Sequence, residues 1–448
     1  MKHERRWRRR LAASVCLFLV GAVAACTVKD GELGRLHGLD GGANGCGFAS
    51  PLVQVQGRPT CAGRLAASHF SNALCSCANV QLASSLVTRG FDSRQGPFQE
   101  PEVGGGGASV GVNGSYLSFE AADIAGAFSI AGPAEVVFRG ALSVRGDFWA
   151  AGNVSAFGLG VVARNAWFGG NLVARGPFTV AGALHHSGTV SAFPLLAGSD
   201  QPGAVSVPKP CACEPGDLLD VAGIVDAARV ENDNGLAIPA DSLTAVSASR
   251  QWILPCGRTY LTGIGGRGDL LIHVSGMSAL FIDGSIDLDG KLVFDVAPGA
   301  EVDVFVKNDV ATEWIALASK ERPATGRLWV GGAKPIVLGS PWVGNLYAPR
   351  ASVATRLGLE VWGSLFVGDF SGDLAATVTY DRSIAESGAT CTAPAPAAGE
   401  CKQCGVCSGG SACVSGSCGA CSVDSDCCSL TICANGRCAP WLDPQKRP

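Results

Sequence analysis

The chain has 448 residues, of which 47% are hydrophobic and only 16% are charged, and its formal net charge is −4. Binding to phosphate backbones needs clustered Lys and Arg, so this slightly acidic balance argues against a nucleic-acid partner. The 61 glycines, with abundant Val and Ala, suit short strands and tight turns better than a helical bundle.

Residues 1–25 have the pattern of an export signal. Six basic residues precede an almost wholly apolar run, Leu11 to Ala25, that is shorter than the ~20 residues of a membrane span. The run ends in Val23-Ala24-Ala25-Cys26, which resembles the lipobox of bacterial lipoproteins. This resemblance implies that Cys26 is lipidated and begins the mature chain, and Thr27 in place of Asp implies an outer-membrane or cell-surface location. The alternative is an ordinary secretory signal that leaves Cys26 as a thiol.

Cysteine usage independently predicts an oxidising compartment. Of the 20 cysteines, Cys16 lies in the leader and Cys26 is the lipidation candidate, and the even remainder indicates disulfides whose pairing the sequence leaves open. The candidates are Cys46, Cys61, Cys75, Cys77, Cys211, Cys213, Cys256 and Cys391 in the body, and Cys401, Cys404, Cys407, Cys413, Cys418, Cys421, Cys427, Cys428, Cys433 and Cys438 in the tail.

Residues 26–103 are predicted to be a lipid-anchored tether followed by a disulfide-pinned segment. The first part is rich in Gly and lacks periodicity. Within residues 61–90, Leu65, Phe70 and Leu74 lie near helical spacing between cysteines, which predicts a short helix.

Residues 104–208 carry a repeat of the form G-x-Φ-x-φ-x, in which Φ and φ are mostly apolar. Glycine recurs at 140, 146, 152 and 158, is replaced by Arg164, and resumes at 170, 176, 182 and 188. Period-two alternation places Φ and φ on one face of a short strand, and strands this short bury that face only when successive coils stack. The repeat therefore predicts a parallel β-helix (β-solenoid), and the alternative is a meander of antiparallel hairpins.

Two further segments complete the predicted body. Residues 209–265 are expected to be a linker corner, with a helix over 218–228. Residues 266–391 alternate apolar and polar positions between Gly and Asp breaks, which predicts a second solenoid part. The predicted class is all-β, with short helices inserted.

Three motifs carry a family resemblance. GNLYAPRA (344–351), VWGSLFVG (361–368) and TYDRSI (379–384) resemble the end of a β-solenoid domain of unknown function found in bacterial surface lipoproteins and in anchored or pilus-associated exoproteins. The resemblance covers roughly residues 100–385 and implies no catalytic residues. Arg350 stands where that family usually has Asn, and Thr379 where it usually has His. The hexads alone also resemble bactofilins, which polymerise end to end but lack signal peptides and disulfides.

Residues 392–400 form a Pro/Ala linker, and residues 401–448 form a cysteine-rich module. The adjacent Cys427-Cys428 followed by CANGRC resembles knottin-like and EGF-like modules, in which disulfides replace a hydrophobic core. Zinc is the competing interpretation, because C-x2-C pairs occur at 401/404 and 418/421.

Groups able to carry chemistry are sparse. His186 occupies an inward hexad position beside His185, which favours a histidine in the core or at a coil end over a metal ligand or base. Residues 231–235 resemble a calcium loop only faintly, and a turn is expected there. The alternating Asp283, Asp287 and Asp289 are expected to form a solvated face, with catalysis as the alternative. Five tryptophans, at 149, 167, 329, 342 and 362, are either core residues or a carbohydrate-stacking surface.

These patterns together predict a non-enzymatic cell-surface lipoprotein with a structural, adhesive or binding role in the envelope. Its expected partners are the membrane, through the lipid anchor, and an envelope or extracellular polysaccharide or protein. No cofactor and no metal is expected. The alternatives are a β-helix enzyme acting on surface polysaccharide, which requires acidic and basic groups converging in one groove, and a self-assembling scaffold, which requires uncapped coil ends.

Overall fold

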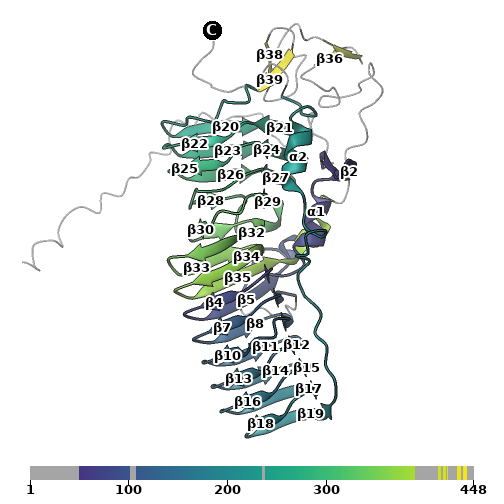
Figure 1. Ribbon diagram of the computed structural model, residues 1–448. Coiled ribbons are helices and arrows are strands. Elements are labelled where there is room, and N and C mark those ends of the chain that lie inside the picture. The colour runs from purple at the N-terminus through teal and green to yellow at the C-terminus, as the bar shows by residue number, and fades with distance from the viewer. Residues whose placement is uncertain are drawn as a thin grey trace, which may run out of the picture. The chain divides into compact units, whose positions relative to one another are not determined.

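The computed structural model describes residues 50–100, 107–234 and 238–388, and residues 412–414, 417–419, 421, 431–434 and 437–440 of the tail. All of them belong to the compact unit Ala43–Pro448. Most of the first three ranges form a parallel β-solenoid of about 13 turns, which confirms the predicted all-β class (Figure 1).

The hexads form the coils as the repeat predicts. Three hexads make one coil, so that Leu142 pairs in parallel with Gly160, eighteen residues later. In most hexad strands the first and third residues are buried while the middle one faces outward. Because every pairing between hexad strands is parallel, the hairpin alternative is wrong.

Each coil has three sides, here named A, B and C, and each side is a ladder of parallel strands. Side A runs through β20 (Arg250–Leu254), β23 (Leu270–Val274), β26 (Leu292–Val296), β28 (Ile315–Ala316), β31 (Trp342–Val343), β33 (Leu359–Trp362), β35 (Ala376–Asp381), β5 (Leu86–Phe91), β8 (Ala122–Ile124), β11 (Leu142–Val144), β14 (Gly160–Val162) and the first parts of β17 (Phe178–His186) and β19 (Leu195–Pro202).

Side B consists of β21 (Gly257–Leu261), β24 (Met277–Ile282), β27 (Glu301–Val306), β29 (Gly326–Val330), the first parts of β32 (Asn345–Thr355) and β34 (Leu365–Gly372), β3 (Leu74–Ser76), β6 (Val110–Val112), β9 (Phe128–Ile130), β12 (Phe148–Ala150), β15 (Ala166–Phe168) and the second parts of β17 and β19.

Side C begins with the separate pair β22 (Ile264–Gly266) and β25 (Ile286–Leu288). It continues as β30 (Ile336–Leu338), the second parts of β32 and β34, β4 (Val80–Leu82), β7 (Tyr116–Ser118), β10 (Val136–Phe138), β13 (Val154–Ala156), β16 (Leu172–Ala174) and β18 (Val190–Ala192).

The order of the coils in space differs from their order in the chain. The stack begins with strands of residues 250–381 and continues with strands of residues 74–202. The two parts join where β34 pairs with β3 and β4, and where β35 pairs with β5. The two solenoid parts predicted from the sequence are therefore one continuous stack. It also includes β3 to β5, from the predicted leading segment, and β20 to β22, from the predicted linker corner.

A crossover returns the chain from the end of β19 to the start of the stack (Figure 1). Two disulfides, Cys75–Cys211 and Cys77–Cys213, fasten this crossover to β3 and to the residue after it. Gly111 of β6 makes room for the crossover, because a Cβ there would lie 3.0 Å from Cβ of Pro210 and 3.1 Å from Sγ of Cys211.

Short elements outside the ladders pack on the outer surface of side B. They include the hairpin β1 (Leu52–Val55) and β2 (Arg58–Cys61), helix α1 (Arg64–His69) and helix α2 (Val221–Ala228), and both helices confirm the sequence prediction. Three 3-10 turns, η1 (Ser93–Gln95), η2 (Pro323–Thr325) and η3 (Arg382–Glu386), complete this part. Among the described residues, no helix has the length and hydropathy to cross a membrane.

The described part of the tail contains two antiparallel hairpins. They are β36 (Ala412–Val414) with β37 (Ser417–Gly419), and β38 (Thr431–Ala434) with β39 (Arg437–Pro440). Cys421 and Cys433 form a disulfide.

Candidate functional site

A cluster of linked ionisable side chains lies where α2 meets side B. Asp220 begins α2 by accepting a hydrogen bond from the Gly223 N–H at 3.0 Å. The apolar face of the helix, formed by Val221, Ile224, Val225 and Ala228, is buried. Its polar face therefore carries Asp226 and Arg229 toward the ends of β21, β24 and β27.

Asp283, directly after β24, is the centre of this cluster. Its carboxylate accepts hydrogen bonds from the Tyr260 hydroxyl at 2.6 Å and the Lys307 ammonium at 2.8 Å, and it also pairs with Arg229. Lys307 in turn lies 2.6 Å from the carboxylate of Asp226. Acidic and basic groups from four elements thus converge, although the enzyme alternative requires that they do so in a groove, and the hollow nearby is lined by other residues.

The electrostatics of the cluster oppose a role in proton transfer. Partial burial alone would raise the pKa of Asp283, but hydrogen bonds from Lys307 and Tyr260 outweigh it and leave that pKa below its ordinary value. Hydrogen bonds to Asp226 and Asp283 raise the pKa of Lys307. Near neutral pH the acid stays ionised and the base stays protonated, whereas a general acid or base works best with a pKa close to the working pH. The arrangement therefore fastens α2 to the solenoid.

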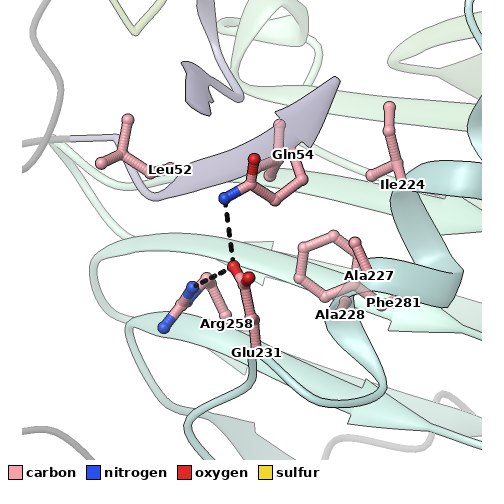
Figure 2. Close-up of a pocket in the computed structure, with 9 residues that line it drawn as sticks. Leu52, Gln54, Ile224, Ala227, Ala228, Glu231, Arg258 and Phe281 are labelled. Atoms are coloured by element: carbon pink, nitrogen blue, oxygen red, sulfur yellow. Dashed lines mark hydrogen bonds and ion pairs between the residues drawn. The ribbon is translucent and has the colours of Figure 1, made fainter. Parts of the chain in front are cut away.

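A small hollow adjoins this cluster between β1 and α2 (Figure 2). Gln54 donates to Glu231 at 3.1 Å, and Glu231 lies 3.8 Å from Arg258. The cavity volume of the hollow is about 10 Å³, which is room for about one water molecule and far below the ~300–1,000 Å³ of small-molecule sites. Its polar groups are already paired with one another, so few hydrogen-bonding groups are left to bind a ligand.

The segment 231–234 is a turn in which the side chains serve the fold. The Asn232 amide donates to the Ala228 carbonyl at the end of α2, at 2.8 Å. Asp233 accepts from the Arg258 backbone N–H at 2.8 Å. The Asn234 side chain bonds both the N–H and the carbonyl of Tyr260. These contacts favour the turn interpretation, and in the described part of the chain no group of His, Cys, Asp and Glu is placed to hold a metal ion.

The other two predicted acids do not join the cluster. Asp287 and Asp289 are exposed on and beside β25, as expected for a solvated face. Sequence reasoning named Asp283 but missed Tyr260, Lys307 and Arg229. Alternation within one strand cannot indicate partners that the coil spacing brings from 23, 24 and 54 residues away.

The adjacent histidines face opposite ways. His186 is buried at the end of the stack, where Nε2 lies 2.9 Å from the Asp200 carboxylate and Nδ1 lies 2.6 Å from the Gly188 carbonyl oxygen. This agrees with the interpretation as a coil-end histidine. His185 points outward and stacks on Trp167 at 5.3 Å between ring centroids.

The tryptophans divide between core and surface. Trp329 and Trp342 are buried, and Trp329 packs against Phe70 after α1. Trp149 and Trp167 stack on the outside of side B, with centroids 4.8 Å apart and planes within 8°. A sugar stacks on the face of an aromatic ring, and in this column neighbouring rings cover most faces. The column therefore stabilises the coils more readily than it binds carbohydrate.

The disulfide candidates fall into two sets. Cys61 and Cys256 are disulfide-bonded in addition to the pairs described above. Cys46, Cys391 and most of the tail cysteines, like Cys26, lie outside the residues whose side chains the structure describes.

Comparison with known proteins finds a match to a protein family for part of the chain. Residues 220–387 match a domain of unknown function, DUF7305. No curated protein and no solved structure matches the chain. The DUF7305 domain runs from the residue before α2 to the residue after η3, so it supplies the first six coils and β35. Its last strands meet β3 to β5, which precede it in the sequence, and the Asp283 cluster lies within it.

Proposed function

We propose that this chain is an exported, lipid-anchored protein of the bacterial cell envelope, with a solenoid that serves as a non-enzymatic structural or adhesive platform. Its anchor is Cys26, its location is the outer membrane or the cell surface, and its cysteine-rich tail is presented to an envelope or extracellular polysaccharide or protein.

The paired disulfides of the crossover carry this proposal. They join residues 136 positions apart and hold the return of the chain against β3. Such bonds persist in oxidising compartments and are rare in the cytosol. The apolar leader and the lipobox-like sequence before Cys26 supply the route and the anchor. The neutralised Asp283 cluster favours this proposal over the polysaccharide enzyme.

The intact mass of the membrane-extracted protein tests the proposal. We expect a chain that begins at Cys26 with a diacylglyceryl and an acyl group added, and with thiols that react with an alkylating agent only after reduction. The variant Cys26→Ser should lose the lipid mass and the membrane association. An unlipidated wild-type chain, or thiols free before reduction, would refute the anchor or the oxidising location respectively.

A further inference from the structure

The solenoid ends differently at its two extremities. After β19 the chain leaves the stack without forming a strand on side C, and in the described residues β18 pairs only with β16 and β19 only with β17. These are the last strands at the lower end of the stack in Figure 1. The backbone groups along their outer edges therefore lack a strand partner.

The opposite end of the stack is covered by its own chain along sides B and C. The Asp233 N–H donates to the Arg258 carbonyl at 2.7 Å, and the Asn234 side chain bonds the Tyr260 backbone along the edge of β21. Val246 pairs with Gly266 at the edge of β22. The core residues Trp252 and Leu254 of β20 are fully buried.

The side chains of the open end are those of an interior layer. Val190, Ala192, Leu195 and Ala197 pack against the core but are only half-buried. From Ser187 to Pro208 the only charged residue is Asp200, and its carboxylate is bonded to His186. Soluble proteins protect exposed strand edges with lysines, prolines or bulges. This edge carries no lysine, its prolines, Pro194 and Pro202, stand only at the two ends of β19, and the one register shift lies on the β17 side of the pairing.

A corner of the solenoid shows that the last coil is left uncovered. The residues directly after β7, β10, β13, β16 and β18 are in register and read Phe119, Arg139, Phe157, Arg175 and Phe193. Arg139 lies over the Phe119 ring at 4.7 Å, and Arg175 lies over Phe157 at 4.7 Å, so one face of each ring is covered from the next coil and both phenylalanines are 42% exposed. Phe193 has no next coil, and its side chain is 90% exposed.

We propose that the coil end formed by β18, Phe193 and β19 is a docking surface for the same surface of a second copy of this chain. The missing layer must be a triangular coil with unpaired edges, and the second copy presents that shape. A two-fold axis perpendicular to the stack makes the facing strands antiparallel, so their backbone groups can exchange hydrogen bonds. Because the chain itself covers sides B and C of the other end, that end does not offer the same surface, and assembly stops at a dimer.

Photo-cross-linking tests the contact in the full chain, in its membrane. With p-benzoylphenylalanine at position 193, irradiation should give a dimer-sized product whose cross-linked peptide comes from residues 187–208 of a second copy. The same probe at Val230, which is 85% exposed away from the coil end, is the control. Cross-links only to another protein, only to the tail of the same chain, or to nothing would overturn the proposal.

Sedimentation equilibrium in density-matched detergent measures the strength of the contact. We expect the double variant Phe193→Asp/Leu196→Lys to weaken dimerisation at least about tenfold. The double variant Val230→Asp/Leu357→Lys should leave it unchanged, since Leu196 and Leu357 are equally exposed at 61%. Equal thermal unfolding of both variants would show that the fold is intact, and a wild-type monomer would overturn the proposal. The sedimentation readout does not depend on the lipid, so this inference and the proposed anchor fail separately.

Discussion

At the scale of single residues, the corner glycines are set by contact between neighbouring coils. A Cβ on Gly152 would lie 2.2 Å from the carbonyl oxygen of Ala134 in the preceding coil. That neighbour is backbone at the corner between β9 and β10, so it cannot rotate away as a side chain could. The regular glycines of the hexads are therefore required because the coils stack too closely for a Cβ atom at the corner.

We predict that Gly152→Ala lowers the free energy of unfolding by about 1–3 kcal/mol, as overpacking does in other interiors. Gly203→Ala is the matched control, because a Cβ at Gly203 would have no neighbour within 4 Å. Urea unfolding of the two variants compares them directly. Equal stability of the two would show that corner glycines are not determined by contact.

Asp283 provides a test that separates structure from catalysis. Because its pKa is below the ordinary value of 3.8, its stabilising effect is complete above that pH and disappears as the pH falls through the lowered value. We predict that Asp283→Asn costs about 1–3 kcal/mol at pH 7, since charged hydrogen bonds are lost. Thermal unfolding should show the difference from wild type shrinking in strong acid.

The exposed Asp287 serves as the control for this experiment. Asp287→Asn should change the stability by less than about 0.5 kcal/mol. If Asp283→Asn were as stable as wild type at neutral pH, the cluster would not be fastening α2, and the polysaccharide enzyme would become the better proposal.

At the scale of elements, the two crossover disulfides close almost the same loop. Either bond alone restrains the unfolded chain between β3 and the crossover, and the second adds only the short rings between positions 75 and 77 and between 211 and 213. In the chain-entropy account, their contributions are therefore strongly non-additive.

We predict that Cys75→Ala/Cys211→Ala costs less than about 1 kcal/mol by loss of restraint, whereas removing both bonds costs about 2–5 kcal/mol. Urea unfolding of both single-bond variants and of the quadruple variant measures this difference. Additive losses would show that local packing around each bond, and not loop closure, supplies the stability.

The elements themselves could be predicted to different extents. The hexads identify their own strands, their inward positions and their parallel stacking, because three hexads make one coil. Gly160, at an inward position of the repeat, is explained only by the structure: a Cβ there would lie 2.3 Å from the Phe178 ring of the next coil. The joining of β34 and β35 to β3, β4 and β5 could not be predicted, because any open coil edge can pair with any other and leaves no periodic signal.

The candidate site shows the same division. The sequence places Asp283 at the end of a strand, and α2 close to its observed bounds. It does not show that the helix packs there, because long-range packing brings Lys307 and Arg229 to Asp283. The tryptophans divide for a similar reason: Trp329 faces outward from its strand, and it is buried by packing against His69 and Phe70 and against the aromatic rings of the neighbouring coils.

At the scale of the whole molecule, the chain order is a permutation of the spatial order. The end of the DUF7305 half lies against the start of the other half, since a Cβ on Gly63 would lie 2.5 Å from Cα of Gly388. A chain that runs from residue 210 to 388 and then, through a short glycine linker, from residue 63 to 209 would trace the coils in sequence.

We predict that this permuted chain folds into the same solenoid and refolds faster than the natural order, because its contacts are closer in sequence. Circular dichroism and protection of the two crossover disulfides would establish the fold, and stopped-flow refolding would give the rate. An insoluble product would show that the natural order of the halves is required.

The pairing of β34 and β35 with β3, β4 and β5 in the middle of the stack also determines when each strand edge is covered during synthesis. A ribosome completes residues 63–202 first, and their coils can stack while β3 and β5 still present an uncovered edge. The strands that cover this edge, β34 and β35, are the last of the solenoid to be made. A chain that ends before residue 381 leaves this strand edge unpaired, so incomplete products are prone to aggregation or proteolysis. In the complete chain, the last strands of the solenoid cover the edge.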